Sequence, residues 1–281
     1  MKKGLAVAVF DAAFGPVVYT GANEKEWDEM FGRTAAAGYN GVDLFIDEKN
    51  ERELCQIKRL LEKHKLGVGL VVCICLKDQG VNFSSPDEKI RKRSVDIYCQ
   101  EIKKASIFAP CAMPIGIIRG TVSEGETLED NLKHLAESMH ALERCAVSSG
   151  IRLCIEPMNR FEANTLLNVP ETMAFIEKYE LSETYILPDL FHMNIEDKNP
   201  ADVLRLAGPL IGHMHVADSN RRAPGMGHIN YDEVLKALKE IGYDGYLSVE
   251  AMPFGDRDGC ARQGAAYLEQ KMKAVGLNQV L

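Results

Sequence analysis

One stretch decides how this chain is interpreted: Leu153-Cys154-Ile155-Glu156-Pro157-Met158-Asn159-Arg160-Phe161-Glu162. Apolar and polar residues alternate from Ile151 to Glu156, as they do in a short β-strand. Pro157 has no N–H to donate to a neighbouring strand, so the strand ends directly after a carboxylate. A polar loop with a second carboxylate, Glu162, follows. The stretch therefore predicts a strand that presents Glu156 at its carboxyl end.

Three later stretches repeat this pattern of a strand with an acid or an imidazole near its carboxyl end. They are Tyr185–Asp189, Leu210–Ala217 and Gly245–Glu250, and a segment with helical character lies between each pair. The polar residues concerned are separated by 33, 26 and 35 positions (189−156, 215−189 and 250−215): Glu156, Asp189, His215 and Glu250. Each separation suits one loop, one helix, a second loop and one strand.

The same alternation of strands and helices extends over the whole chain, without a linker or a low-complexity segment. The expected strands span residues 4–10, 41–46, 67–76, 111–118, 151–156, 185–189, 210–217 and 245–250. The expected helices span residues 24–37, 51–65, 86–108, 127–149, 170–177, 200–207, 231–241 and 257–274. Repeated strand–helix units of this kind predict an α/β fold with a parallel sheet.

We therefore expect a single (β/α)₈ TIM barrel domain over residues 1–281, because eight strand–helix units typically need about 250 residues. A doubly wound sheet is the alternative fold. It would need a glycine-rich phosphate-binding turn after the first strand, and Asp11–Pro16 contains no G-x-G-x-x-G pattern.

The carboxyl ends of the strands of a closed barrel meet at one mouth, so the four strand-end residues are expected to converge there. A lone strand-end acid is more often a solvated turn residue or a helix cap, but four at matching positions favour a shared divalent-metal site. Three carboxylates and one imidazole form a hard, oxygen-rich ligand set. We expect one divalent ion, Mn²⁺ first, with Mg²⁺ or Co²⁺ as alternatives, rather than a structural zinc.

The composition, 46% hydrophobic and 26% charged, is that of an ordinary globular protein with a buried core. A net charge of −8 argues against a nucleic-acid partner, which would need a basic surface. No apolar run is long enough to span a membrane, and the first residues are too short for a signal peptide. Eight scattered cysteines without C-x-x-C pairs are expected to be unpaired, which favours a cytoplasmic location.

Several long motifs in the second half of the chain resemble those of the xylose-isomerase-like superfamily of sugar isomerases and epimerases. These motifs are Ile155–Glu162, Asp189–Glu196, Gly212–Arg221 and Ser248–Glu250. The nearest resemblance is to ketose 3-epimerases of the D-tagatose and D-psicose type and to 5-keto-L-gluconate epimerase. The segments after the first and fourth strands look more like the keto-acid enzyme: Asp11–Phe14 and Ile118–Gly120.

The resemblance implies a role for each strand-end residue. Four residues would hold the metal: Glu156, Asp189, His215 and Glu250. Glu156 and Glu250 would also be the catalytic acid–base pair, and three residues would contact the substrate: Glu162, His192 and Arg221. The substrate would be a small sugar or sugar acid, and relatives of this kind form homodimers or homotetramers.

Epimerisation beside a carbonyl requires that a proton is removed on one face of the carbon and another is returned on the opposite face. A divalent cation stabilises the negative charge of the intermediate enediolate as a Lewis acid. Glu156 and Glu250, on the fifth and eighth strands, are expected to lie across the mouth from one another, which suits this exchange.

Two further residues are interpreted from their positions on the strands. Arg119 ends the fourth strand, so its guanidinium is expected to reach the mouth and bind a substrate carboxylate, which favours a keto acid over a neutral ketose. His213 shares a strand face with His215 one layer deeper. We expect it to be a core histidine with its hydrogen bonds satisfied rather than a metal ligand.

Three other functions are compatible with parts of this pattern. Lyases of the same superfamily use the same proton abstraction for β-elimination, including C-glycoside cleavage, and would need a roomier mouth. An AP-endonuclease-type hydrolase would need more strand-end histidines and a basic face. A non-catalytic sugar-binding barrel would not need the paired glutamates. The sequence therefore favours a metal-dependent epimerase or isomerase of a ketose or keto sugar acid.

Overall fold

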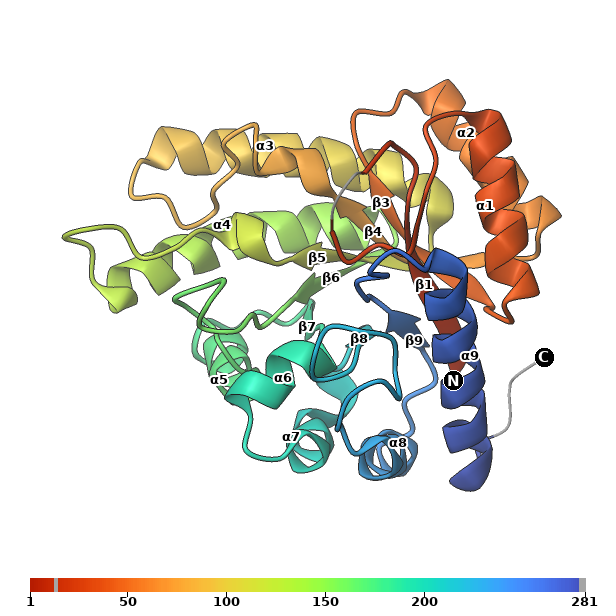
Figure 1. Cartoon of the computed structure of the whole chain (residues 1–281). Helices are drawn as coiled ribbons and strands as arrows, with labels where there is room; N and C mark the ends of the chain where they lie inside the picture. The colour runs from red at the N-terminus through yellow and green to blue at the C-terminus, as the bar shows by residue number, and fades with distance from the viewer. Residues whose placement is uncertain (13–14, 278–281) are drawn as a thin grey trace.

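The computed structural model describes residues 1–12 and 15–277 (Figure 1). Its main strands are β1 Lys2–Ala8, β3 Gly41–Ile46, β4 Gly67–Cys73, β5 Cys111–Ile115, β6 Ile151–Ile155, β7 Thr184–Ile186, β8 Met214–Val216 and β9 Tyr246–Val249. They pair in parallel in the order β7-β6-β5-β4-β3-β1-β9-β8. Parallel bridges from Ile186 to Ile211 and from Asp189 to His215 join the two ends of this order. The sheet therefore closes, which confirms the (β/α)₈ barrel and contradicts the doubly wound alternative.

Helices surround the sheet and follow the strands in turn (Figure 1). They are α1 Glu24–Ala36, α2 Glu51–Lys63, α3 Glu88–Ala105, α4 Leu128–Ser148, α5 Val169–Lys178, α6 Leu190–Glu196, α7 Pro200–Ala207, α8 Tyr231–Glu240 and α9 Arg257–Ala274. The helix α6 and the short strand β2, Tyr19–Thr20, which pairs with β1, are additional to those predicted. Within the described residues, no helix is both long enough and apolar enough to cross a membrane.

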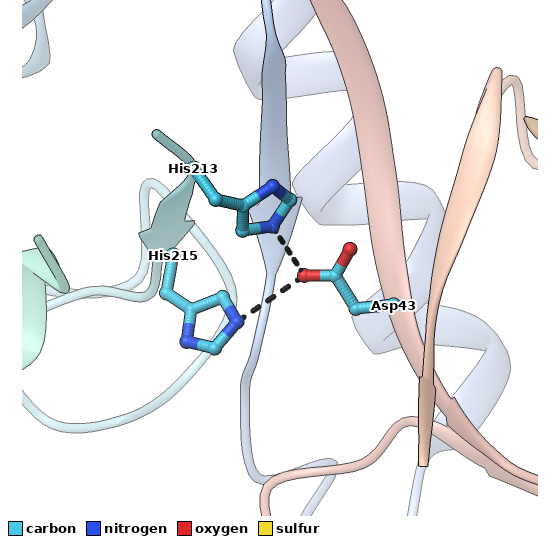
Figure 2. Close-up of side chains that lie close together, drawn as sticks. All are labelled: Asp43, His213 and His215. Carbon is cyan, nitrogen blue, oxygen red and sulfur yellow. Dashed lines mark hydrogen bonds and ion pairs between the residues drawn. The ribbon is translucent and has the colours of Figure 1, made fainter. Parts of the chain in front are cut away.

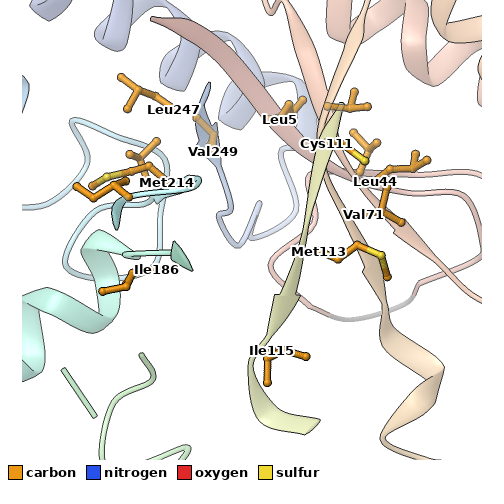
Figure 3. Close-up of a cluster of buried hydrophobic side chains, with 14 of the residues drawn as sticks. Leu5, Leu44, Val71, Cys111, Met113, Ile115, Ile186, Met214, Leu247 and Val249 are labelled. Carbon is orange, nitrogen blue, oxygen red and sulfur yellow. The ribbon is translucent and has the colours of Figure 1, made fainter. Parts of the chain in front are cut away.

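Alternate residues of each strand face opposite sides of the barrel wall. Leu5 and Leu44 pack in a large apolar cluster that also contains helix residues such as Ile57 (Figure 3). Their neighbours Ala6 and Phe45 belong to a separate, smaller cluster. Larger side chains thus fill the layer between the sheet and the helices, while the other face of each strand lines the interior of the barrel, where the site lies.

Two of the eight cysteines are paired, which contradicts the expectation that all are free. Cys99 on α3 and Cys145 on α4 form a disulfide, because these two helices pack side by side. The remaining cysteines are free: Cys55, Cys73, Cys75, Cys111, Cys154 and Cys260. Sequence spacing did not predict the pair, since the two residues are far apart along the chain and only helix packing brings them together. The cysteines therefore no longer support a reducing compartment.

Candidate active site

A cavity lies at the carboxyl ends of the strands. Its polar lining consists of Glu156, Glu162, His192, His215, Arg221 and Glu250. Its wall also contains the apolar residues Pro16, Phe45, Val72, Pro114, Ile117, Ile118 and Met158. Of the site residues predicted from the sequence, Asp189 lies just behind this lining, and Arg119 points elsewhere.

The structure brings the four predicted metal ligands together. One ligand atom from each of them lies within 4.8 Å of the others: Glu156, Asp189, His215 and Glu250. The Nδ1 atom of His215 is 3.2 Å from Glu156 Oε1 and 3.4 Å from Glu250 Oε2. Glu156 and Glu250 directly follow β6 and β9, so two separate strand ends deliver carboxylates to one imidazole nitrogen.

Asp189 has two tasks at the start of α6. Its Oδ1 accepts a hydrogen bond from the backbone N–H of Phe191 at 2.9 Å and so caps the helix. Its Oδ2 faces the site, where it pairs with Arg221. Asp189 is therefore both a helix cap, through Oδ1, and a residue of the site, through Oδ2.

The charges of the site shift the acids in opposite directions. Burial and the nearby carboxylates raise the pKa of Glu250 to about 7, although His215 and Arg221 partly offset this. Burial acts in the same direction on Glu156, but the hydrogen bond and charge of His215 outweigh it and lower the pKa of Glu156. For Asp189, burial is outweighed by Arg221, and its pKa is also lowered. The two glutamates therefore have different proton affinities in closely similar surroundings.

Arg221 supplies the positive charge nearest to these acids. Its two terminal nitrogens form ion pairs with Asp189 and Glu250, and its guanidinium lies 4.7 Å from the ring centre of Phe191. The backbone of Arg221 is left-handed, with φ of 60°. A non-glycine residue adopts this conformation rarely, and such positions concentrate at functional sites. The loop after β8 is thus shaped to turn Arg221 into the mouth.

Glu162 and His192 meet through a residue that the sequence did not single out, Asn159. The side-chain amide of Asn159 donates to Glu162 Oε1 at 2.9 Å and lies 2.7 Å from His192 Nδ1. Asn159 is 1% exposed. The sequence feature that could have identified Asn159 is its position three residues after Glu156, in the polar loop that follows β6. The structure makes it the link that orients both predicted substrate contacts.

Arg119 does not face the mouth, contrary to expectation. Its side chain is 1% exposed, and its guanidinium donates to the backbone carbonyls of Gly116, Glu156, Thr165 and Leu166. Burial lowers the pKa of Arg119 to about 10. The Nε–H of Arg119 has no partner among the described residues but is buried. Arg119 is not among the residues that line the cavity, so it does not bind a substrate carboxylate there, and its support for a keto acid is lost. The other segment used for that argument includes residues 13 and 14, which lie outside the described residues.

His213 is the satisfied core histidine that the sequence predicted. Its Nε2 lies 2.7 Å from Oδ2 of Asp43, which is fully buried on β3 (Figure 2). His213, Asp43 and His215 also form a group whose ligand atoms lie within 4.8 Å of one another. Asp43 was not among the site residues predicted from the sequence. The sequence feature that could have identified Asp43 is a lone acid within the otherwise apolar strand Gly41–Ile46, because a buried carboxylate needs a polar partner.

Comparison with known proteins agrees with this geometry. A family model described as xylose isomerase-like TIM barrel matches residues 31–271. The chain belongs to this family. Among curated proteins, D-psicose 3-epimerase of Agrobacterium fabrum is 29% identical over 248 residues, which is 83% of this chain and 83% of that protein. The 3-dehydro-D-guloside 4-epimerase of Escherichia coli is 26% identical over 219 residues, 77% of this chain and 70% of that protein.

Solved structures of two epimerases share the fold of this chain. L-ribulose 3-epimerase superposes with a TM-score of 0.81 at 22% identity, covering 98% of this chain and 95% of that chain. The apo form of 3-keto-D-glucoside 4-epimerase from E. coli gives a TM-score of 0.79 at 22% identity, covering 96% and 99%. The curated relatives named above are epimerases. The chain is accordingly an enzyme of the isomerase class, and four residues at its mouth are close enough together to hold a metal ion.

Proposed function

We propose that this chain is a divalent-metal-dependent epimerase of a ketose or keto sugar, acting as one barrel domain. The observation that carries the proposal is the position of Glu156 and Glu250, whose carboxylates approach His215 Nδ1 from two strand ends at 3.2 and 3.4 Å. Both glutamates line the cavity in which a small sugar would lie. This arrangement supports proton exchange at a carbon held between them.

The donor set fits a divalent cation. Three carboxylates, one imidazole nitrogen and their close approach match the hard ligand spheres of Mn²⁺ and Mg²⁺, and we propose Mn²⁺ first, with Mg²⁺ or Co²⁺ as substitutes. The residues that would hold it are Glu156, Asp189, His215 and Glu250. When bound, such an ion acts as a Lewis acid toward the substrate carbonyl and stabilises the charge that develops there.

The two glutamates suit opposite halves of the proton exchange. Glu156 has the lowered pKa and is ionised near neutral pH, so it can accept the proton beside the carbonyl. Glu250 is the more readily protonated of the two in the absence of a cation, and we assign to it the proton that is returned on the other face. Paired acids whose environments push their pKa values apart are typical of acid–base catalysis. For the reverse epimerisation, the two roles exchange.

The remaining polar lining would bind the hydroxyl groups of the sugar. We assign this role to Glu162, His192 and Arg221, of which the first two are oriented by Asn159. Phe45 and other apolar residues of the wall would exclude water from the reacting carbon.

The charge of the cavity supports an uncharged sugar. Arg221 is the one arginine or lysine among the described lining residues, and it already pairs with Asp189 and Glu250. With Arg119 committed to backbone carbonyls, a neutral ketose or keto sugar fits this cavity better than a sugar acid. By analogy with its relatives we also propose a homodimer or homotetramer.

The test is proton exchange in deuterated water. The enzyme and Mn²⁺ are incubated with a panel of neutral ketoses, keto sugars and keto sugar acids, and NMR follows both the epimer and deuterium beside the carbonyl. We expect both products with a neutral member of the panel. Glu156→Gln and Glu250→Gln should each lower turnover by about 10²–10⁴-fold while circular dichroism is unchanged. Near-normal turnover of either variant would contradict the proposal, and an elimination product would indicate a lyase.

A further inference from the structure

The imidazole of His215 contacts acids on both of its nitrogens. Nδ1 faces Glu156 and Glu250, whereas Nε2 lies 3.2 Å from Oδ2 of Asp43, on the opposite side of the ring (Figure 2). We propose that Asp43, anchored by His213, is a positioning residue that keeps the proton of His215 on Nε2 and leaves Nδ1 free to bind the cation. This inference rests on the metal site of the proposed function.

The chemistry of the ring makes this choice of nitrogen decisive. A neutral imidazole carries its single proton on one nitrogen, and only the other nitrogen has a lone pair for a metal. An ionised carboxylate accepts hydrogen bonds and cannot donate one. Carboxylates face both nitrogens, and Nδ1 also lies within hydrogen-bond distance of Glu156. A cation at Nδ1 would exclude a proton there, and the ring would then keep its proton on Nε2, the nitrogen that faces Asp43. Carboxylate partners of this kind tune metal-bound histidines in other proteins.

His213 holds the Asp43 carboxylate in place. The Nε2 of His213 lies 2.7 Å from the same oxygen, Asp43 Oδ2, that approaches His215. The two imidazole rings are perpendicular, with centres 5.6 Å apart, so they reach one oxygen from different directions. All three residues are at most 2% exposed, and water does not compete strongly for these contacts.

The backbone beside Asp43 is shaped to admit this group. The pairing of β3 with β4 shifts register between Val42 and Asp43, as in a β-bulge, so that Gly69 has no partner in the ladder. A Cβ atom on Gly69 would lie 2.8 Å from Asp43 Oδ1 and 2.8 Å from His213 Cε1. A larger residue there would push against both side chains. The bulge and the glycine together make room for the buried pair.

A second cation held by Asp43, His213 and His215 is the competing interpretation of the same cluster. The 2.7 Å contact between His213 Nε2 and Asp43 Oδ2 is a hydrogen-bond length, and His215 would have to serve two ions at once. Ligand atoms around a shared ion are each about 2.0–2.2 Å from it, so two of them ordinarily lie more than about 3 Å apart, farther than the 2.7 Å seen between His213 and Asp43. We therefore assign one ion to the mouth, and to Asp43 the role of the charged group that faces Nε2 of His215 at 3.2 Å.

Metal affinity and the protonation of the ring test the inference. Metal-free wild type, Asp43→Asn and a control, Glu143→Gln, are titrated with Mn²⁺ by calorimetry. Glu143 on α4 is also buried, and it accepts hydrogen bonds from the backbone N–H of Glu183 and the hydroxyl of Thr184 at the start of β7. Its variant therefore measures the general effect of losing a buried carboxylate. Asp43→Asn should bind Mn²⁺ about 10–100-fold more weakly, because its amide can donate to Nε2 and favour the wrong ring form. Glu143→Gln should stay within about twofold of wild type.

Nitrogen-15 NMR of histidine-labelled, Mg²⁺-loaded protein shows directly which ring nitrogen of His215 carries the proton. We expect the proton of His215 on Nε2 in wild type. In Asp43→Asn at the same Mg²⁺ concentration, we expect a fraction of molecules that have lost the ion and carry the proton on Nδ1. Should Asp43→Asn fail to fold, His213→Leu, which removes the anchor, is compared with His213→Gln, which keeps a donor. Weaker Mn²⁺ binding in His213→Leu that His213→Gln restores would support the inference.

The outcomes separate this inference from the proposed function. Equal Mn²⁺ affinity of wild type and Asp43→Asn, equal affinity of the two His213 variants, or a wild-type proton on Nδ1 overturns the inference and leaves the epimerase proposal intact. Two equivalents of bound Mn²⁺ in wild type, reduced to one by Asp43→Asn, would also overturn it in favour of a second ion. Absence of Mn²⁺ binding by wild type would overturn the metal site and the inference together.

Discussion

Arg119 donates an N–H to the backbone carbonyl of Glu156 at 2.9 Å, so the residue expected to bind substrate instead anchors a proposed catalytic residue. The same guanidinium bonds the carbonyls of Gly116 and Thr165 at 3.1 and 2.7 Å. It therefore ties the loop after β5 to both ends of the loop after β6. Because carbonyl oxygens neutralise it only partly, burial of this cation has a large cost that the surrounding loops must offset.

Replacing Arg119 with methionine should destabilise the protein by about 2–4 kcal/mol, because several buried carbonyls lose their donor. Urea unfolding followed by circular dichroism measures this. Arg160→Met is a matched control, since Arg160 is largely exposed in its ion pair with Glu196 and should cost at most about 1 kcal/mol. In Arg119→Met, kcat/KM should fall by similar factors for neutral and acidic substrates. A loss confined to acidic substrates would restore the original interpretation of Arg119.

Asn159→Ala should lower kcat/KM about 10-fold with little change in Mn²⁺ affinity. The variant removes the amide that orients Glu162 and His192, and one such hydrogen bond contributes about 1–2 kcal/mol. Steady-state kinetics on the epimerised sugar measures the effect. Asn164→Ala, an exposed residue of the same loop, should behave as wild type. Unchanged kinetics in Asn159→Ala would mean that Glu162 and His192 are oriented by other contacts.

Asp197→Asn should stabilise the protein at about pH 8 and leave it nearly unchanged at about pH 4. Burial and the neighbouring acids raise the pKa of Asp197 to about 7, its Oδ2 is buried without a partner, and its charge sits at the C-terminal cap of α6. An acid with a raised folded pKa contributes its full stability below its unfolded pKa, near 4, and loses it as pH rises to about 7.

The expected gain for Asp197→Asn is about 1–2 kcal/mol at the higher pH, reduced from the full pKa difference because the residue is partly exposed to solvent. Chemical unfolding of wild type and variant at both pH values measures it. Asp96→Asn, at an exposed position on α3, should show no pH-dependent difference from wild type. A gain for Asp197→Asn of the same size at both pH values would show that the effect does not arise from its ionisation.

Mn²⁺ should raise the melting temperature of protein dialysed against a chelator. A ligand at 100 times its Kd stabilises a folded protein by about 2.7 kcal/mol, or roughly 5–10 °C for a chain near this size. Calorimetric melting with and without Mn²⁺ measures the shift. Asp189→Asn should lose most of it, whereas Glu162→Gln should keep it, because Glu162 lies outside the proposed ligand set. A similar shift in Asp189→Asn would remove Asp189 from the set.

Most of the fold could be predicted from two patterns in the sequence: the alternation of side chains along each strand and the alternation of strands with helices. Strand residues such as Leu5 and Leu44 face the helices because every second side chain of a strand points the same way, and this period is visible in the sequence. The same rule places Glu156 and Glu250 at the mouth, since both come directly after strands that run in parallel. Local periodicity and strand polarity are properties of short segments, so the sequence alone determined the barrel and the gathering of the strand-end residues.

Tertiary structure decided where long side chains from those same positions point and what they meet. Arg119 turns away from the mouth because backbone carbonyls more than thirty residues away in the sequence accept its hydrogen bonds. Asp43 on β3 contacts His215 on β8 because the closed barrel brings the interior faces of these two strands together. The Cys99–Cys145 pair likewise depends on which helices lie adjacent. Contacts of this kind depend on distances between segments, which no local pattern encodes.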